Sequence, residues 1–453
     1  MGGPDPTVET IDRLIARIDR VLTRQVDAII HHPRFRRLEA SWRQLHRLAR
    51  ERRGADVVVR VLPVSWRELE RDARRAAEFD QTRLFALIYS GEFDMPGGQP
   101  FGLLIGDYEV TAGTHPDHRT DDVDVLEAVA AVAAASFAPF VCAAAPPLLD
   151  VERFAELDRE LDMAYLREME GNARWARLRR QPDARFLGVV VPRVLVRAPY
   201  RAADPRRFDG FGYRESVAPD GSTLVWGCAA YSFAEVVLRE YAASGWFADL
   251  RGAREEDRGG GLVPRGPTVA FDTDRGEIAA QPPVEIRFTP TQERMIAEFG
   301  LIPLMPLPFG RDLVFNTNQS LHAPQRYDNE AASQNARIAA MLQYVLCASR
   351  FAHYLKLIMR ENVGSVTTVD QLRGLLNDWL GRYTIGNDDA DAATKARFPL
   401  RSARVVIAEV PGRPGAFSCV VQLQPHYQLD DVSASFQLLA DMNARGSEGG
   451  GTA

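Results

Sequence analysis

The sequence predicts an α/β fold: a mixed, layered sheet core with an N-terminal helical hairpin and a C-terminal strand pair used for inter-subunit linking. Apolar residues recur at helical spacing through the first 50 residues, which predicts amphipathic helices. Strand-like and helix-like segments then alternate, a pattern typical of layered α/β domains. Two more apolar runs, separated by a proline–glycine turn sequence, stand near the C-terminus.

Residues 1–54 are expected to form the helical hairpin. The apolar residues of its first helix share one face, and they are Ile11, Leu14, Ile15, Ile18, Leu22, Val26 and Ile29. Pro33 ends this helix, and a second helix is predicted from Phe35 to Arg53. Because burying each Ile or Leu contributes roughly 1.5–3 kcal/mol, the face must pack on something, either the second helix or a partner chain. The interface expected with a partner consists of Ile11, Leu14, Ile15, Ile18 and Leu22.

Residues 55–400 are expected to form the α/β core. Four segments have the composition of strands, and they are Val57–Leu62, Phe101–Val110, Pro139–Ala144 and Phe186–Arg197. Five segments are expected to be helical, and they are Arg83–Gly91, Asp121–Ser136, Trp226–Ser244, Ala331–Glu361 and Val369–Tyr383. Arg201–Ser222 and Arg251–Pro283 are predicted to be long loops. The first of them gives a candidate break between two subdomains near residues 200–225.

Residues 401–440 are expected to carry the linking strands, ahead of a flexible tail over residues 441–453. Arg404–Val410 and Ala416–Leu423 are the strand candidates, and Pro411–Gly415 is a turn sequence. A lone two-stranded hairpin is marginal in water, so the pair is expected to join strands of neighbouring subunits. The interface residues expected here are Val405, Ile407, Phe417, Val420, Val421 and Leu423.

Composition argues against several classes of function. The net charge of −6 gives no basic field, so nucleic acid is not an expected partner. No apolar run reaches the ~18 residues that a membrane span needs, and residues 1–7 lack the pattern of a secretory signal. We therefore expect a cytoplasmic protein without membrane insertion. The four cysteines are widely spaced and are expected to be free thiols: Cys142, Cys228, Cys347 and Cys419.

The known catalytic motifs are absent from the sequence. It contains no P-loop, dinucleotide-binding fingerprint, nucleophile elbow or H-E-x-x-H, so we expect neither an enzyme nor a cofactor. His115 and His118 have the spacing of half a metal site, but no third ligand is near them in sequence, so no metal site is expected. His353 is expected to be a core or interface residue. An enzyme with an unrecognised site near His115, His118 or His353 is one alternative.

The stretch Arg34–Arg53 is rich in arginine and includes aromatic residues, as RNA-binding patches do. Glu39 and Glu51 interrupt it, and its apolar residues have helical spacing, so we interpret it as a solvated helix face. His31 and His32 end the first helix, where a cationic histidine suits the helix dipole.

Several segments carry a family resemblance. The longest are Ile29–Leu45 (IIHHPRFRRLEASWRQL) and Gly97–Glu109 (GGQPFGLLIGDYE). Shorter collinear segments are Ile88-Tyr89, Pro139-Phe140, Pro192-Arg193, Trp226-Gly227, Phe299–Leu304, Arg350–Lys356 and Pro425–Leu429. Together, over about residues 8–440, they resemble the large sheath subunit of the bacterial type VI secretion system, the TssC/VipB/ImpC/EvpB family.

The resemblance implies a phage-tail-like structural protein. Members pair with a small sheath subunit of the TssB/VipA type, and the heterodimers stack into a hollow contractile helix with other copies of the chain. The resemblance also implies contacts with an inner tube protein of the Hcp type and a baseplate, with contraction driving effector delivery. A recycling AAA+ ATPase of the ClpV type is the partner supported least, because this chain begins close to the helix near Val8. The other alternative is a diverged, non-contractile scaffold paralogue.

Overall fold

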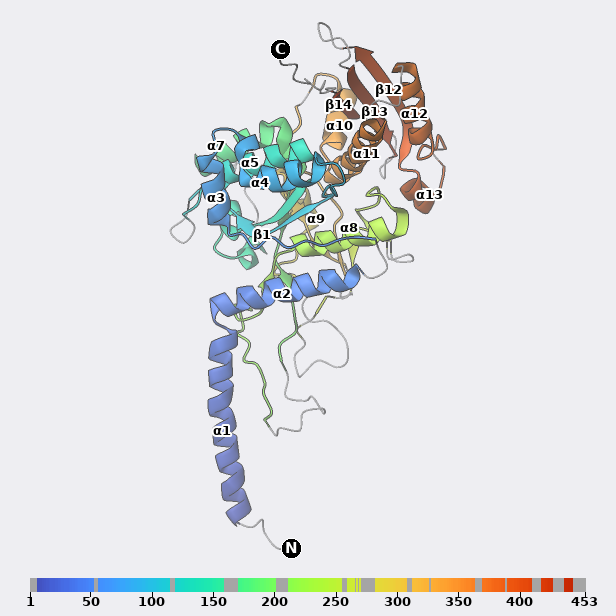
Figure 1. Ribbon diagram of the computed structural model, residues 1–453. Helices are drawn as coiled ribbons and strands as arrows, with labels where there is room; N and C mark the ends of the chain where they lie inside the picture. The colour runs from blue at the N-terminus through green and yellow to red at the C-terminus, as the bar shows by residue number, and fades with distance from the viewer. Residues whose placement is uncertain are drawn as a thin grey trace.

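The computed structural model describes most of the chain. The described residues are 6–52, 56–114, 119–158, 170–200, 211–254, 259–264, 266–267, 269, 282–307, 312–325, 327–362, 369–387, 389–409, 417–426 and 436–442. Figure 1 shows a layered α/β body, one long helix that projects from it, and a second sheet toward the C-terminal end.

Two consecutive helices begin the described chain, as the periodicity predicts. α1 covers Pro6–Ile30 and α2 covers Pro33–Glu51. Proline suits the first turn of a helix, and Nδ1 of His32 caps α2 by accepting from the Arg34 N–H at 3.3 Å. α1 points away from the body, whereas α2 crosses beneath it (Figure 1). The expectation that α1 packs along α2 is wrong, because the apolar face of α1 stays exposed.

The centre of the body is a four-stranded parallel sheet in the order β1-β2-β3-β9. The strands are β1 (Leu104–Val110), β2 (Phe140–Ala144), β3 (Leu187–Val191) and β9 (Ile302–Pro303). Alternate side chains of β2 join two apolar clusters, one with helix α5 (Asp122–Ser136) and the other with helix α8 (Ala230–Ser244). Helices thus cover both faces, which is why β2 and β3 are buried along their whole length.

Shorter elements surround this sheet. The helical ones are α3 (Trp66–Arg75), η1 (Phe79–Gln81), α4 (Arg83–Phe85), the π-helical η2 (Ala86–Phe93), η3 (Pro146–Leu149), η4 (Phe154–Asp158), α7 (Glu170–Arg180), η5 (Pro182–Phe186) and α9 (Pro290–Glu298). Short strands pair locally: β4 (Val194–Leu195) with β5 (Trp226–Gly227), β6 (Ala253–Arg254) with β7 (Gly259–Gly260), and β11 (Leu313–Val314) with both β10 (Met305–Pro306) and β8 (Leu262–Val263).

Four predicted elements differ from the structure. Val57–Leu62 lies outside every strand of the described chain, because no neighbour pairs with it. The strand expected over Phe186–Arg197 is interrupted at Pro192, which has no N–H to donate. The helix expected from Trp226 begins only at Ala230, after β5. The long helix over Ala331–Glu361 is two helices, α10 (Glu330–Ala339) and α11 (Leu342–Glu361), because the Leu342 N–H turns to the Asn318 carbonyl at 2.9 Å.

The C-terminal region builds a second sheet on a helical support. β12 (Leu400–Glu409) pairs antiparallel with β13 (Phe417–Pro425), so the predicted strand pair is confirmed. A third strand, β14 (Phe436–Met442), was not predicted and pairs with the other edge of β13. α11 and α12 (Val369–Gly381) share an apolar cluster with this sheet, and α13 (Ala392–Arg397) precedes it. The predicted turn over residues 411–415 lies outside the described residues. Of the tail predicted over residues 441–453, Asp441 and Met442 belong to β14, and residues 443–453 lie outside the described residues.

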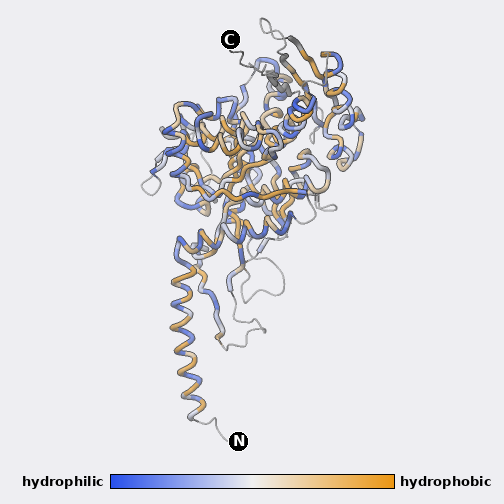
Figure 2. Tube along the Cα trace, viewed as in Figure 1, coloured by the Kyte–Doolittle hydropathy of each residue, from blue (hydrophilic) through white to orange (hydrophobic). Residues whose placement is uncertain are grey.

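Hydrophobic residues concentrate on the strands at the centre of the body, whereas along α1 they alternate with hydrophilic ones (Figure 2). The apolar cluster of the C-terminal region draws residues from both sides of position 400. The domain boundaries expected at residues 54 and 400 stay predictions. Residues 201–210, within the candidate subdomain break, lie outside the described residues.

Candidate functional site

The apolar face of α1 is open over the length of the helix. α1 has 25 residues, which at a rise of 1.5 Å per residue corresponds to about 37 Å. Five predicted interface residues are 39–57% exposed, and they are Ile11, Leu14, Ile15, Ile18 and Leu22. Val8, Val21 and Ile29 of the same helix are also exposed. The structure therefore brings the predicted N-terminal residues together on one uncovered surface.

A buried ionic cluster fixes α2 to the body next to the junction with α1. Arg197 donates to Glu39 of α2 at 2.7 Å and to Glu215 at 2.5 Å, and these three side chains are at most 9% exposed. Burial opposes ionisation, but the hydrogen bonds and charge of Arg197 and Arg43 hold the pKa of Glu39 below its ordinary value. Burial also opposes the charge of Arg197, whose pKa Glu215 and Glu39 nevertheless raise. Glu39 and Arg197 are thus ionised and paired at neutral pH.

The same cluster reaches α1. Nε2 of His31 lies 3.2 Å from Oε1 of Glu215, and the Tyr213 hydroxyl donates to Asp27 at 2.6 Å. Sequence reasoning missed these contacts and interpreted the stretch around Glu39 as solvated. A signal was available: Glu39 is an isolated acid in an arginine-rich stretch.

Two further polar contacts hold α2 against the body. The Gln44 amide donates to the Cys228 carbonyl at 2.8 Å and accepts from the Cys228 N–H at 3.1 Å. Arg47 pairs with Glu235 of α8 at 2.8 Å. Burial raises the pKa of Glu235 to about 7, even though the charge of Arg47 opposes this rise. α2 is therefore part of the body, whereas α1 projects from it (Figure 1).

The C-terminal sheet turns most of its predicted interface residues inward. Val405, Ile407, Val421 and Leu423 are 1–5% exposed and pack with α11 and α12. Their side chains therefore stabilise the chain's own fold. Val420 is half-buried, and the side chain of Phe417 lies outside the described residues.

The edges of the C-terminal sheet are open in the described chain. β13 is central, so β12 and β14 each leave one edge without a strand partner among the described residues. One isolated bridge, between Thr384 and Leu400, reaches the start of β12. Such edges can accept the strand of another chain.

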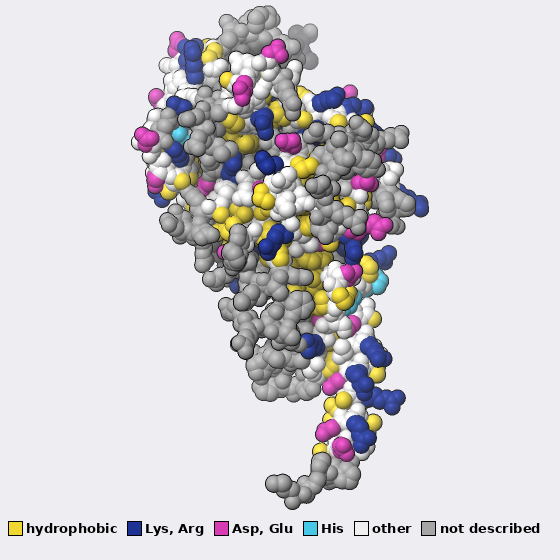
Figure 3. Space-filling model, turned by 180° about the vertical axis from the view of Figure 1, so that it is seen from behind, with side chains coloured by type: hydrophobic (Ala, Val, Ile, Leu, Met, Phe, Trp, Pro, Cys, Tyr) yellow, Lys and Arg dark blue, Asp and Glu magenta, His cyan; other side chains and the backbone are white. Residues whose placement is uncertain are grey.

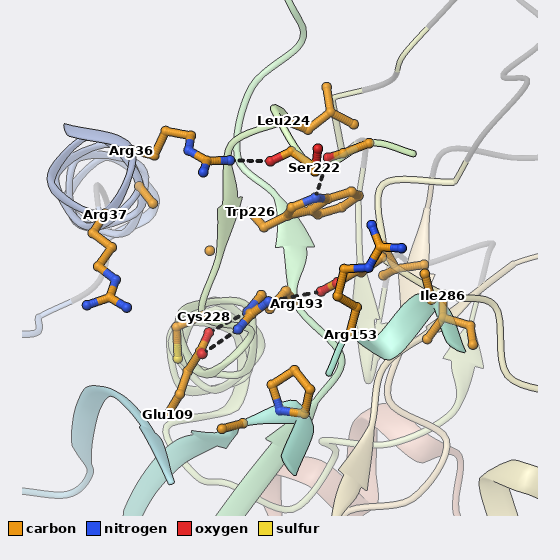
Figure 4. Close-up of a pocket in the computed structure, with 18 of the residues that line it drawn as sticks. Arg36, Arg37, Glu109, Arg153, Arg193, Ser222, Leu224, Trp226, Cys228 and Ile286 are labelled. Atoms are coloured by element: carbon orange, nitrogen blue, oxygen red, sulfur yellow. Dashed lines mark hydrogen bonds and ion pairs between the residues drawn. The ribbon is translucent and has the colours of Figure 1, made fainter. Parts of the chain in front are cut away.

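A cleft of about 1030 Å³ lies outside the carboxyl ends of β1, β2 and β3, where parallel sheets commonly bind ligands. Figure 4 shows how its charged residues lie. Arg193 donates to both carboxylate oxygens of Glu109 at 2.6 Å, and Arg153 pairs with Asp220 at 2.7 Å. Arg36 of α2 reaches the Ser222 carbonyl. The charged side chains named here are thus engaged with the chain's own groups across the cleft.

Of the three candidate histidines, His353 lies in the described part of the chain. Nε2 of His353 lies 2.9 Å from the Ser136 carbonyl, and the rings of Phe93 and Phe137 flank it. Burial lowers the pKa of His353 to about 4, so this histidine is a neutral core residue. His115 and His118 lie outside the described residues.

Two other kinds of site are absent from the described residues. No three or more His, Cys, Asp or Glu side chains there are grouped so that they could hold a metal ion. No helix there combines the length and the apolar character that a membrane span requires. The four cysteines are free and buried.

Comparisons with known proteins identify the family. Residues 12–322 match the model of the EvpB/VC_A0108 tail sheath N-terminal domain. Residues 331–442 match the model of its gpW/gp25-like domain. The type VI secretion system sheath protein TssC1 of Pseudomonas aeruginosa (strain PAO1) is 34% identical over 441 residues, which are 96% of this chain and 86% of that protein.

A solved structure is also similar. It is a sheath tail protein from Desulfitobacterium hafniense, with 9% sequence identity and a TM-score of 0.34, and the match covers 74% of this chain and 57% of that one. The two family matches and the TssC1 relative span almost the whole sequence. The chain therefore belongs to the EvpB/VC_A0108 family of type VI secretion system tail sheath proteins.

Proposed function

We propose that this chain is the structural large subunit of a contractile sheath, working in the cytoplasm. It pairs with a small sheath subunit, and the pairs polymerise with further copies around an inner tube on a baseplate. Contraction then drives the tube and its effectors outward. The observation that carries this proposal is the uncovered apolar face of α1.

The exposure of α1 is hard to explain for a protein that works alone. Burying apolar surface contributes roughly 25 cal/mol per Å², and contiguous apolar patches on a protein surface commonly mark interaction sites. The base of the helix is nevertheless held to the body through Asp27 and His31. A face held out in this way suits a stable contact with another chain.

The C-terminal sheet supports polymerisation by a second kind of contact. Its inner face is occupied by α11 and α12, but its outer edges offer main-chain donors and acceptors. Main-chain pairing depends little on side chains, so one edge can accept strands from neighbours in a repeating assembly. In the proposed sheath, α1 therefore holds the small subunit and the C-terminal sheet links pairs to each other.

Co-production with the small sheath subunit of the same gene cluster tests the proposal. Negative-stain microscopy should show tubules for the wild type. The variant Ile15→Asp/Ile18→Asp should lose both the small subunit and the tubules while it keeps the melting temperature of the wild type. Tubules formed equally well by this variant would contradict the proposal.

A further inference from the structure

α1 carries opposite charges along the two borders of its apolar face. At 100° per residue, Arg17 and Arg24 follow one border of this face, and Arg13 and Arg20 continue the row of exposed arginines onto the opposite side of the helix. Asp12 and Asp19 follow the other border. Figure 3 shows the basic side chains gathered along one edge of the helix. The exposed surface of α1 is thus apolar in the middle, cationic on one side and anionic on the other.

Contacts with the chain's own body occur on the anionic side. The half-buried residues of α1 lie on the same side of the helix as Asp12, and they are Asp19, Thr23, Val26 and Asp27. Asp27 accepts a hydrogen bond from the Tyr213 hydroxyl. The arginine side has no comparable cover. Within the part of the chain that the structure describes, Arg17 and Arg24 have no ion-pair partner. The cationic border is therefore available to another molecule.

The arginine row also disfavours an isolated helix. Arg13 and Arg17 are four residues apart, as are Arg20 and Arg24, and like charges at this spacing repel on a helix. Arg13 gains partial relief from Glu9 at 3.7 Å. Carboxylates of a partner, spaced three or four residues apart, would turn this repulsion into attraction along the row.

The apolar face has the spacing that another helix recognises. Ile11, Leu14, Ile18 and Val21 alternate at intervals of three and four residues, as in the seam of a coiled coil. We propose that an amphipathic helix of the partner chain covers this face and sets a row of carboxylates against Arg17 and Arg24. This inference rests on the proposed function and adds the chemistry of the partner's binding surface.

A membrane or a nucleic acid is a poorer match for the same arginines. α1 holds Glu9, Asp12, Asp19 and Asp27 beside its four arginines, so its net charge is zero. Helices that bind anionic membranes are usually rich in basic residues and carry Trp, Phe or Leu on the apolar face. The apolar side chains of α1 that stand exposed are Val, Ile and Leu. Charge balance and composition both favour a protein helix.

The test compares the full chain with the variant Arg17→Glu/Arg24→Glu, using the small sheath subunit of the same gene cluster as the probe. The matched control is Arg34→Glu/Arg71→Glu, which makes the same change in charge at exposed arginines of α2 and α3. We expect the first variant to bind the small subunit about tenfold more weakly or worse, and the control to bind within about twofold of the wild type. Wild-type binding should weaken between about 50 and 500 mM salt, and that of the first variant should not.

Two further measurements keep the test decisive. The milder variant Arg17→Gln/Arg24→Gln, which adds no negative charge, should bind about threefold more weakly and melt as the wild type does. Wild-type affinity in Arg17→Glu/Arg24→Glu would overturn the inference. A second result would also overturn it. In that result the wild type binds phosphatidylserine vesicles, Arg17→Glu/Arg24→Glu alone loses this binding, and the affinity of that variant for the small subunit is unchanged. If Ile15→Asp/Ile18→Asp abolishes the complex while the arginine variants keep it, the inference fails and the proposed function stands.

Discussion

α1 and the C-terminal sheet both carry regularly spaced apolar residues, and the structure uses them in opposite ways. On α1 these side chains are 39–57% exposed, whereas four of those predicted on β12 and β13 are 1–5% exposed. The sheet has α11 and α12 of its own chain behind it, whereas the apolar clusters of the described residues include no exposed side chain of α1. A period in the sequence shows which residues share a face, but the fold decides whether the chain itself covers that face. The chain thus offers side chains for assembly at one end and main-chain edges at the other.

The strongest effect on stability is expected at the base of α2. Arg197→Met leaves Glu39 and Glu215 buried without their shared cation, which should lower the free energy of unfolding by about 3–5 kcal/mol. Chemical denaturation measures it. The control is Arg43→Met, which removes a half-exposed partner of Glu39 and should cost about 1 kcal/mol or less. An equal decrease in the free energy of unfolding of the two variants would show that the cluster does not hold α2 to the body.

Adjacent residues of β12 should separate the two faces of the C-terminal sheet. Ile407→Ala empties a buried position and should cost about 2–5 kcal/mol. Val406→Ala, at a position that is 41% exposed, should change the free energy of unfolding by about 0.5 kcal/mol or less. Similar losses in both variants would mean that the sheet does not rest on α11 and α12 in solution.

The pH dependence of the free energy of unfolding should report on the contact between α2 and α8. Because the pKa of Glu235 is about 7 in the folded chain, the native state holds a proton that the unfolded chain releases near the ordinary pKa of 4.5. Stability should therefore fall as the pH rises from 4.5 to 7 and level off above 7. Glu235→Gln should remove about 1–3 kcal/mol of this fall, measured by denaturation across that range. An unchanged slope in the variant would refute a raised pKa.

The smallest effect on stability is expected on α1 itself. Ile15→Asp/Ile18→Asp changes two exposed positions, so the free energy of unfolding of the isolated chain should stay within about 0.5 kcal/mol of the wild type. Thermal melting of the chain without a partner checks it. A loss comparable to that of Ile407→Ala would place the face of α1 inside the chain's own core.

Sequence patterns predicted much of the architecture because local composition fixed it. Nearly unbroken apolar runs predicted the covered strands β2 and β3, and an alanine-rich segment predicted helix α5. Val57–Leu62 shows the limit of such patterns. Its β-branched residues favour an extended chain, but a strand also needs a neighbour, and none in the described chain pairs with it.

The candidate site was predictable only in part, for a related reason. Helical spacing identified the exposed residues of α1, yet the same reasoning could not exclude that α2 covered them. The cluster of Arg197, Glu39 and Glu215 joins residues far apart in the sequence, so the isolated acid Glu39 could be noticed locally but its partners could not. β14 was missed because its pairing with β13 spans a segment without a clear turn sequence.

Hydrogen exchange along α1 tests the central claim most directly. The backbone amides of α1 from Thr7 to Ile30 are compared in the isolated chain and in the complex with the small sheath subunit, with those of α5 as an internal reference. Our account predicts fast exchange along α1 in the isolated chain, slowed by about 100-fold or more in the complex, while α5 is protected in both. Equal exchange along α1 in the two states would contradict the claim that α1 is the surface on which the assembly is built.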